Sequence, residues 1–218
     1  MTWEDLKKVE LNQSFDIRDL RDCCRAVYGA IAWPGKREGC AVVVAMSHSF
    51  SHGESEVCLI AEYESFSVRD IVRQSCGLDV KYGPKQWIGN REYGPAQRFI
   101  NEMNDNLTKR KQKTFSLSEP FELLEMKPLY PYILDEIRRL RNEDRRRLFL
   151  PDDSKIRNYL SEIEADEIAD LELGAYPAAE ALAFGTIEIL RQEKYLREQG
   201  PYRSPYDNDV LRRGFKKR

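Results

Sequence analysis

Three apolar stretches decide the fold of this chain: AVYGAIA at 26–32, CAVVVAM at 40–46 and EVCLIAEY at 56–63. They are rich in valine, isoleucine and tyrosine, which favour β-strands. The turn cluster PGKREG at 34–39 and the polar stretch at 47–55 separate them, which predicts three consecutive strands joined by turns. Because the stretches are nearly continuous in apolar residues, we expect both faces of the sheet to be covered.

The residues that follow predict a helix and then a fourth strand. Ser67 is a suitable N-cap, with Asp70 three residues later as in a capping box, and we expect this helix to end at Gly77. The fourth strand is expected at Gln86–Asn90. The remaining chain predicts a helix over 96–107, a last strand within 115–126, and helices over 130–147, 154–172 and 177–199. The predicted fold class is therefore α/β, with a helical C-terminal part.

Length and composition limit the classes of protein to consider. With 218 residues the chain can form one domain with its own core, which we place at 1–190, followed by a basic, flexible tail at 191–218. The formal net charge of −2 excludes a uniformly basic coat for nucleic acid. The five cysteines form no CxxC pair, which argues against zinc, and their odd number without a signal peptide favours a reducing cytoplasm. No run approaches the ~20 apolar residues that cross a bilayer, so we expect no membrane partner.

Glu180 is the first candidate for chemistry. It is the one charged residue in the run PAAEALAFGT at 177–186, on a predicted helix that is otherwise suited to burial. A carboxylate in such surroundings is costly unless a cation or another group pairs with it. Glu180 is therefore a candidate catalytic residue and metal ligand. The alternative is a position at the solvent edge of an ordinary amphipathic helix.

Three further residues offer oxygen ligands near strand ends. Glu62 and Glu64 flank Tyr63, and the period of two in a strand places both on the same face of the sheet. This pair suits catalysis or metal binding, and the alternative is two solvated side chains. Asn90 ends the fourth strand, where its amide oxygen can coordinate a cation without adding charge. The alternative for Asn90 is a turn-forming residue beside Gly89.

Basic residues are concentrated in a few segments despite the negative net charge. Lys36 and Arg37 lie in the first turn, six arginines lie within 138–147, and the segment 191–218 holds nine Lys and Arg against four Asp and Glu. Such segments can contact a phosphate backbone. For 138–147 the alternative is a solvated helix face, because acidic residues are interleaved with the arginines.

The order of the predicted elements resembles the start of a ribonuclease H-like nuclease core. In such a core three antiparallel strands lead into a helix and a fourth strand, and the first strand carries a metal-binding aspartate. In this sequence that position falls on Ala32. Two-metal cleavage of phosphodiesters uses three or four carboxylates that hold two divalent cations about 4 Å apart.

Three stretches, together covering about 25–190, resemble the C-terminal nuclease domain of phage terminase large subunits. YGAIAWPGKREGCAVVVAM resembles its first hairpin, CLIAEYESFSVRDIVRQ its third strand and following helix, and ADLELGAYPAAEALAFGTIEIL its final helix. The resemblance implies that the first-strand aspartate corresponds to Ala32, the fourth-strand acid to Asn90 and the late-helix acid to Glu180. The chain has no Walker-type glycine-rich loop, so the packaging ATPase is absent.

The resemblance implies a phage or prophage DNA-packaging nuclease in the cytoplasm of a bacterial host. If the site is intact, it would hydrolyse double-stranded DNA with Mg²⁺ or Mn²⁺. Glu180, with Glu62 or Glu64, would hold the metal, and Lys36 and Arg37 would contact phosphate. The alternative is a catalytically inactive relative that serves as an assembly, adaptor or DNA-binding protein, with a packaging ATPase or portal protein as partner. An unrelated α/β protein would show a different strand order.

Overall fold

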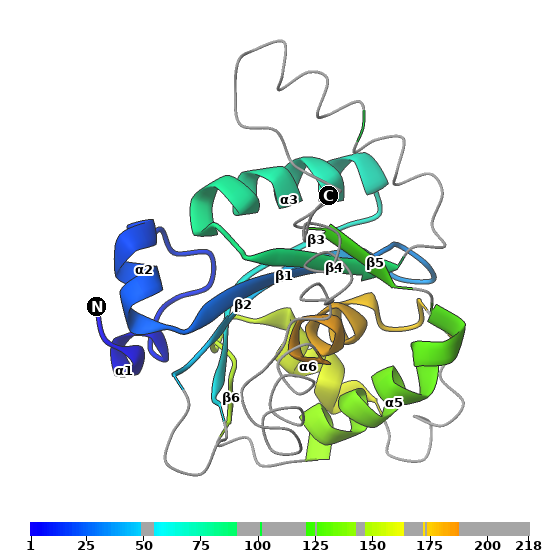
Figure 1. Ribbon diagram of the computed structural model, residues 1–218. Helices are drawn as coiled ribbons and strands as arrows, with labels where there is room; N and C mark the ends of the chain where they lie inside the picture. Colours follow the sequence, from blue (N-terminus) through cyan, green and yellow to red (C-terminus); the bar gives the residue numbers. More distant parts are fainter. Residues whose placement is uncertain are drawn as a thin grey trace, which may run out of the picture.

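The computed structural model describes residues 1–48, 55–90, 101, 121–124, 126–142, 147–163, 172 and 174–187, with the backbone alone at 90, 121–124, 126–132 and 142. Within these residues the centre of the molecule is a six-stranded sheet with the order β5-β4-β1-β2-β3-β6 (Figure 1). Its strands are β1 (Ala26–Ala32), β2 (Gly39–Met46), β3 (Val57–Ser65), β4 (Gln86–Asn90), β5 (Phe121–Leu124) and β6 (Leu148–Phe149).

The directions of the strands identify the fold. β2 is antiparallel to both β1 and β3, whereas β4 is parallel to β1 and β5 is parallel to β4. Three antiparallel strands followed by a fourth strand that lies parallel beside the first form the ribonuclease H-like order that the sequence predicts. β6 is an addition to that order, because it pairs in parallel with the outer edge of β3. The fold is α/β, with a mixed sheet between layers of helices.

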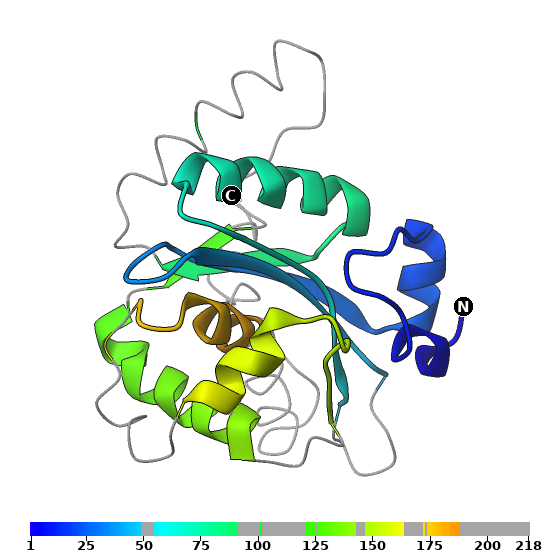
Figure 2. The ribbon, with the colours of Figure 1, turned by 180° about the vertical axis from the view of Figure 1, so that it is seen from behind.

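The helices form two layers, one on each face of the sheet (Figures 1 and 2). Helix α3 (Val68–Tyr82) covers one face, with α1 (Trp3–Leu6) and α2 (Ile17–Cys23) at one end of the sheet. The other face is covered by α5 (Met126–Asn142), α6 (Lys155–Glu162) and an unlabelled helix over 177–187. The sequence predicts all three helices, but two bounds are wrong: α5 begins at Met126 and not at 130, and α6 ends at Glu162 and not at 172, because Ile163 has an extended backbone. The helix predicted over 96–107 and the tail at 191–218 lie outside the described residues, apart from the helical residue Asn101.

Alternate residues of the central strand supply the two cores. All of β2 is buried. Val42 and Val44 belong to the core beneath α5, α6 and the helix 177–187. Val43 and Ala45 belong to the core beneath α1, α2 and α3. The expectation that both faces of the sheet are covered is therefore confirmed.

Helix α3 begins where the sequence predicts and ends later. The Ser67 hydroxyl accepts a hydrogen bond from the Asp70 backbone N–H at 3.2 Å, which confirms the N-cap. The predicted end at Gly77 is wrong, because the helix continues to Tyr82 and stops at Gly83, which has the left-handed φ of 57°. A glycine inside a helix costs about 1 kcal/mol relative to alanine. Burial of the Tyr82 ring, only 1% exposed, outweighs that cost.

Strands β1 and β4 approach each other closely through a glycine and a tryptophan. Gly29 pairs with Trp87, and a Cβ atom on Gly29 would lie 2.3–2.6 Å from three ring carbons of that indole. The indole N–H of Trp87 donates a hydrogen bond to Asp79 of α3 at 3.3 Å. The glycine thus leaves the space in which a fully buried tryptophan ties β4 to the α3 layer.

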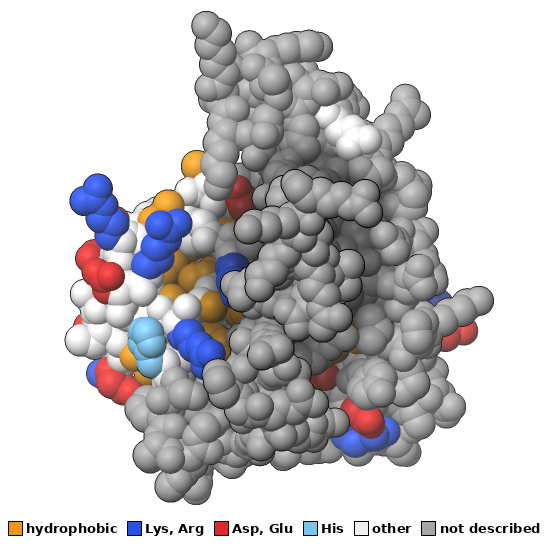
Figure 3. All heavy atoms as spheres, viewed as in Figure 1, with side chains coloured by type: hydrophobic (Ala, Val, Ile, Leu, Met, Phe, Trp, Pro, Cys, Tyr) orange, Lys and Arg blue, Asp and Glu red, His pale blue; other side chains and the backbone are white. Residues whose placement is uncertain are grey.

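Three further features of the described residues concern their surface charge, their thiols and the apolar character of their helices. On the described part of the face in Figure 3, acidic side chains lie among the basic ones, so no continuous basic coat forms there. All five cysteines are buried free thiols. Among the described residues, no helix has the length and apolar character needed to cross a membrane.

Candidate functional site

The sheet brings Ala32 and Asn90 to neighbouring strand ends. Gly89 of β4 pairs in parallel with Ile31 of β1, so the backbone of Asn90 follows beside Ala32. Across the sheet, Ala32 pairs with Cys40. The methyl group of Ala32 is only 1% exposed and belongs to the core that contains the helix 177–187. The position that the resemblance gives to a metal-binding aspartate is therefore a buried methyl group.

Glu180 lies in the first turn of the helix 177–187, and the residue is 7% exposed. One of its oxygens accepts a hydrogen bond from the backbone N–H of Gly174 at 2.7 Å. Burial raises the pKa of Glu180 to about 7, although backbone hydrogen bonds from Gly174 and Tyr176 act in the opposite direction. The solvent-edge alternative for Glu180 is therefore wrong: this carboxyl is inside the protein, and a backbone donor partly compensates its burial.

Glu62 faces α6 and holds the start of that helix. Its carboxylate accepts hydrogen bonds from the Ser154 hydroxyl at 2.7 Å and from the Lys155 backbone N–H at 2.8 Å. Ser154 is the N-cap residue of α6, but its own side chain caps no backbone N–H. Glu62, from another part of the chain, therefore accepts the hydrogen bond from the first backbone N–H of the helix in place of Ser154. Burial raises the pKa of Glu62, and the hydrogen bonds from Ser154 and Lys155 oppose this effect.

Glu64 lies on the same face of β3 and contacts the same helix. Its carboxylate pairs with the Lys155 ammonium group at 2.9 Å and accepts a hydrogen bond from the Tyr159 hydroxyl at 3.5 Å. The prediction that Glu62 and Glu64 share a face is confirmed, and the Glu64 side chain is only 5% exposed rather than solvated. Their roles in catalysis or metal binding stay predictions.

The basic residues of the first turn already have acidic partners. Lys36 pairs with Glu172 at 2.7 Å and Arg37 pairs with Glu162 at 3.0 Å. The Arg37 guanidinium also lies over the Tyr176 ring, 4.4 Å from its centroid. These contacts join the turn between β1 and β2 to the segments on either side of residues 164–171. Their role in binding phosphate stays a prediction.

The same turn approaches the partner of Glu180. A Cβ atom on Gly35 would lie 2.8 Å from the carbonyl oxygen of Gly174, whose N–H group bonds to Glu180. Gly35 follows Ala32 by three residues, so the first strand and the late helix meet at one end of the sheet. The backbone after Ala32 and the loop before Glu180 therefore lie close together, while the side chain of Asn90 lies outside the described residues.

The described residues do not fit a centre for Mg²⁺ or Mn²⁺. Such cations need several hard oxygen ligands, and two-metal cleavage needs three or four carboxylates. Within the described part of the chain, no group of three or more His, Cys, Asp or Glu residues is placed to hold a metal ion. At the Ala32 end of the sheet, the described acid beside Gly174 is Glu180, and one of its oxygens already accepts a hydrogen bond from that backbone N–H.

Sequence reasoning missed a buried polar cluster between α5 and the helix 177–187. Glu136, only 4% exposed, accepts hydrogen bonds from the Thr186 hydroxyl at 2.6 Å and from the Arg139 guanidinium at 2.6 and 2.9 Å. The spacing of Glu136 and Arg139 on one helix is a local signal for this pair. The contact with Thr186, fifty residues away, has no local signal. The cluster fixes the helix that carries Glu180.

Comparisons with known proteins found similar structures but no similar sequence. No family model matches the chain, and no curated protein matches it. The chain is similar in structure to the large terminase nuclease of the thermophilic phage G20c with bound zinc, with a TM-score of 0.43 and 12% identity over 85% of this chain and 96% of that chain. It is also similar to the Holliday junction resolvase of fowlpox virus, with a TM-score of 0.37 and 10% identity over 76% of this chain and 98% of that chain.

Proposed function

We propose that this chain is a ribonuclease H-like, nuclease-type protein of phage or prophage DNA packaging that binds double-stranded DNA without cleaving it. The strand order supports the nuclease-type scaffold. The observation that carries the loss of cleavage is the buried methyl group of Ala32 at the end of β1. Its neighbour on β4 is an amide residue, Asn90, so neither strand end supplies a carboxylate.

The state of Glu180 supports the same proposal. Hydrolysis with two metal ions relies on ionised carboxylates that offset the positive charge of the cations. Burial raises the pKa of Glu180 to about 7, so the environment of this carboxyl group disfavours its ionised form. Its oxygen is also engaged by the N–H of Gly174. The carboxyl group thus contributes to the local fold of the helix 177–187 and its preceding loop.

The first turn is the proposed contact with DNA. The pair between Lys36 and Glu172 is about three-quarters exposed on both sides, and such surface pairs contribute little to stability. A phosphate group can therefore replace Glu172 as the partner of Lys36 at low cost. The partner for assembly would be a packaging ATPase or portal protein.

Cleavage assays on variants with carboxylates restored at the two strand ends test the claim that the wild type does not cleave DNA. Plasmid DNA is incubated with Mn²⁺ and either the wild-type protein, the Ala32→Asp/Asn90→Asp variant, or that variant with Glu180→Gln added. We expect the wild type to leave the plasmid supercoiled and the double variant to nick it, because two strand-end carboxylates would then join Glu180. The triple variant should be inactive. Mn²⁺-dependent cleavage by the wild type itself would overturn the proposal.

Filter binding with a labelled DNA duplex tests the claim that the protein binds DNA. We expect the wild type to retain the duplex with an affinity that falls as salt rises, and Lys36→Glu to weaken binding. Arg73→Glu is the matched control, because Arg73 is an exposed, ion-paired residue on α3. This helix covers the face of the sheet opposite to α5, α6 and the helix 177–187 (Figure 1). Failure of the wild type to retain DNA at low salt, or equal losses in both variants, would contradict binding through the first turn.

A further inference from the structure

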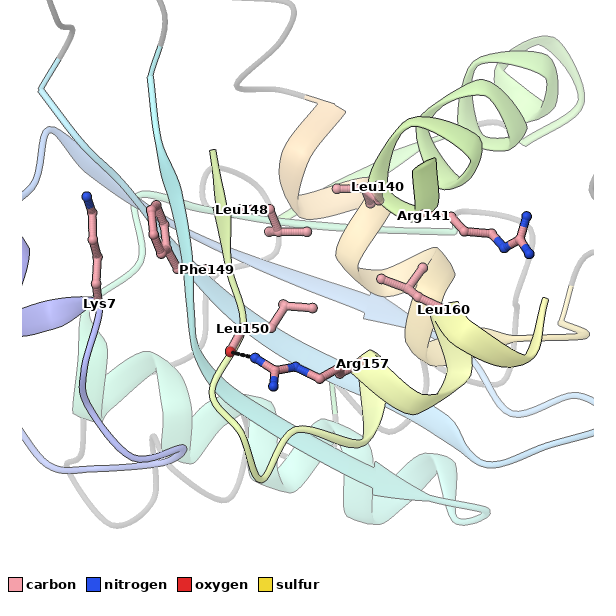
Figure 4. Close-up of a pocket in the computed structure, with 8 residues that line it drawn as sticks. All are labelled: Lys7, Leu140, Arg141, Leu148, Phe149, Leu150, Arg157 and Leu160. Carbon is pink, nitrogen blue, oxygen red and sulfur yellow. Dashed lines mark hydrogen bonds between the residues drawn. The ribbon is translucent and has the colours of Figure 1, made fainter. Parts of the chain in front are cut away.

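A pocket of about 360 Å³ lies beside β6, at the edge of the sheet. Its apolar walls come from the end of α5, from β6 and the residue after it, and from α6 (Figure 4). The residues that form them are Leu140, Leu148, Phe149, Leu150 and Leu160. Figure 4 shows the leucine side chains approaching one another from these elements. The volume lies within the range of natural ligand sites, which begins at about 300 Å³.

All the charged side chains that line this pocket are cations. Lys7 is already paired with Glu4 and Glu56, and its ammonium nitrogen lies 4.3 Å from the centroid of the Phe149 ring. Arg157 pairs with Asp152 at 2.6 Å and donates a hydrogen bond to the carbonyl oxygen of Leu150 at 2.5 Å. These two cations are therefore largely committed to contacts within the chain.

Arg141 differs from the other two cations. In the part of the chain that the structure describes, its guanidinium has no hydrogen bond and no ion pair, and its side chain is half-buried. Figure 4 shows it leaving the end of α5 beside Leu160, at the margin of the apolar walls. Its neighbour Arg138, one turn earlier on α5, pairs with Asp135 at 2.8 Å. The pocket therefore combines apolar walls with one uncommitted cation and no acidic lining residue.

We propose that this pocket docks a segment of a partner protein in which an apolar side chain lies next to a carboxylate. The apolar side chain would enter between Leu148 and Leu160, and the carboxylate would pair with Arg141. The volume suits one or two large side chains, and the cationic lining selects an acidic neighbour. A DNA backbone carries the matching charge but presents no comparable apolar group, so the five apolar lining residues favour a protein segment.

This site is separate from the one in the proposed function. β6 pairs with Val57 and Cys58 at the beginning of β3, whereas Glu64, in the row of Ala32 and Cys40, lies near its end. A test of the docking proposal is therefore independent of whether the protein cleaves DNA or binds it through Lys36.

Selection from a random ten-residue peptide library, followed by calorimetry, tests the docking proposal. The probes are the library members that the wild type retains. We expect these peptides to share an Asp or Glu within a few positions of Leu or Phe. The strongest peptide should lose about tenfold or more in affinity for Arg141→Glu, because one charge-assisted hydrogen bond is lost.

The control variant changes another arginine on the same helix, α5. Arg138→Glu has the same charge change on α5 and should alter the affinity less than twofold. An unchanged melting temperature of both variants would establish that they fold. No enrichment of acidic and apolar peptides, equal effects of the two variants, or displacement of the peptide by duplex DNA with loss of DNA binding in Arg141→Glu would overturn the proposal.

Discussion

Glu180 illustrates how a single buried carboxyl group makes stability depend on pH. Its ordinary pKa of 4.5 is raised to about 7 by burial in the folded protein. Between these pH values the folded state holds a proton that the unfolded chain has released. The free energy of unfolding therefore falls as the pH rises from 4.5 to about 7, and the stabilisation is complete only below the unfolded pKa.

Replacing Glu180 with glutamine should remove this dependence. The amide oxygen of Glu180→Gln can still accept the hydrogen bond from Gly174, but it has no charge to bury. We expect urea denaturation to show that the wild type loses on the order of 3 kcal/mol more than the variant between pH 4.5 and pH 8. Parallel stability profiles for the two proteins would contradict the burial of this carboxyl group.

Local sequence identified the acidic candidates, but their partners could not be predicted. Glu62 and Glu180 stand out because each is a charge within or beside an apolar run. The donor to Glu62 is the hydroxyl of Ser154, ninety-two residues away, and only the folded chain brings the two together. A sequence pattern shows that a buried carboxylate needs a partner, but not which residue supplies it.

Among the elements, α6 depends most clearly on a contact from outside itself. The helix has eight residues, and helices shorter than ~12 residues are marginal in isolation. Its N-cap, Ser154, donates to Glu62 instead of capping a backbone N–H, and Glu62 bonds to the first helical N–H at Lys155. α6 is thus tied to β3 at its first turn.

Removal of this tie should destabilise the protein measurably. Glu62→Ala leaves the buried Ser154 hydroxyl and the Lys155 N–H without their acceptor, which we expect to lower the free energy of unfolding by about 2–3 kcal/mol in urea denaturation at pH 7. Glu64→Ala should cost less, because its partner, the Lys155 side chain, is 61% exposed. Equal losses in the two variants would mean that Glu62 does not cap α6.

Element boundaries were less predictable than element types. The capping pattern at Ser67 located the start of α3 correctly, because that signal is local. The end was misplaced at Gly77 because glycine is also tolerated inside a helix when apolar residues beyond it are buried. A Cβ atom on Gly77 would meet nothing within 4 Å, so no packing reason requires a glycine there.

At the scale of the whole molecule, the order of the sheet was predictable for a physical reason. Short turns allow only antiparallel neighbours, and a helix between the third and fourth strands allows the fourth to return parallel to the first. β6 was not predictable, because its two residues follow the arginine-rich segment and carry no strand pattern of their own. The strand forms because these two residues pair with Val57 and Cys58 at the edge of β3.

Amide hydrogen exchange should reflect this arrangement. β2 is buried throughout and has a neighbouring strand on each side, so its amides should exchange only through global unfolding. β6 has two residues and one neighbour, so its amides should exchange faster than those of β2 by several orders of magnitude. Mass spectrometry of peptides covering the two strands would measure the difference. Comparable protection would contradict the marginal attachment of β6.

The close fit of Trp87 against Gly29 gives the protein an intrinsic optical probe. An indole with no exposed surface emits at shorter wavelength than one in water, and Asp79 lies within reach of its N–H group. The chain also contains Trp3 and Trp33, so once these two are replaced by phenylalanine, a shift of the emission maximum to the red would report that Trp87 and the fourth strand have detached, without any dye or label.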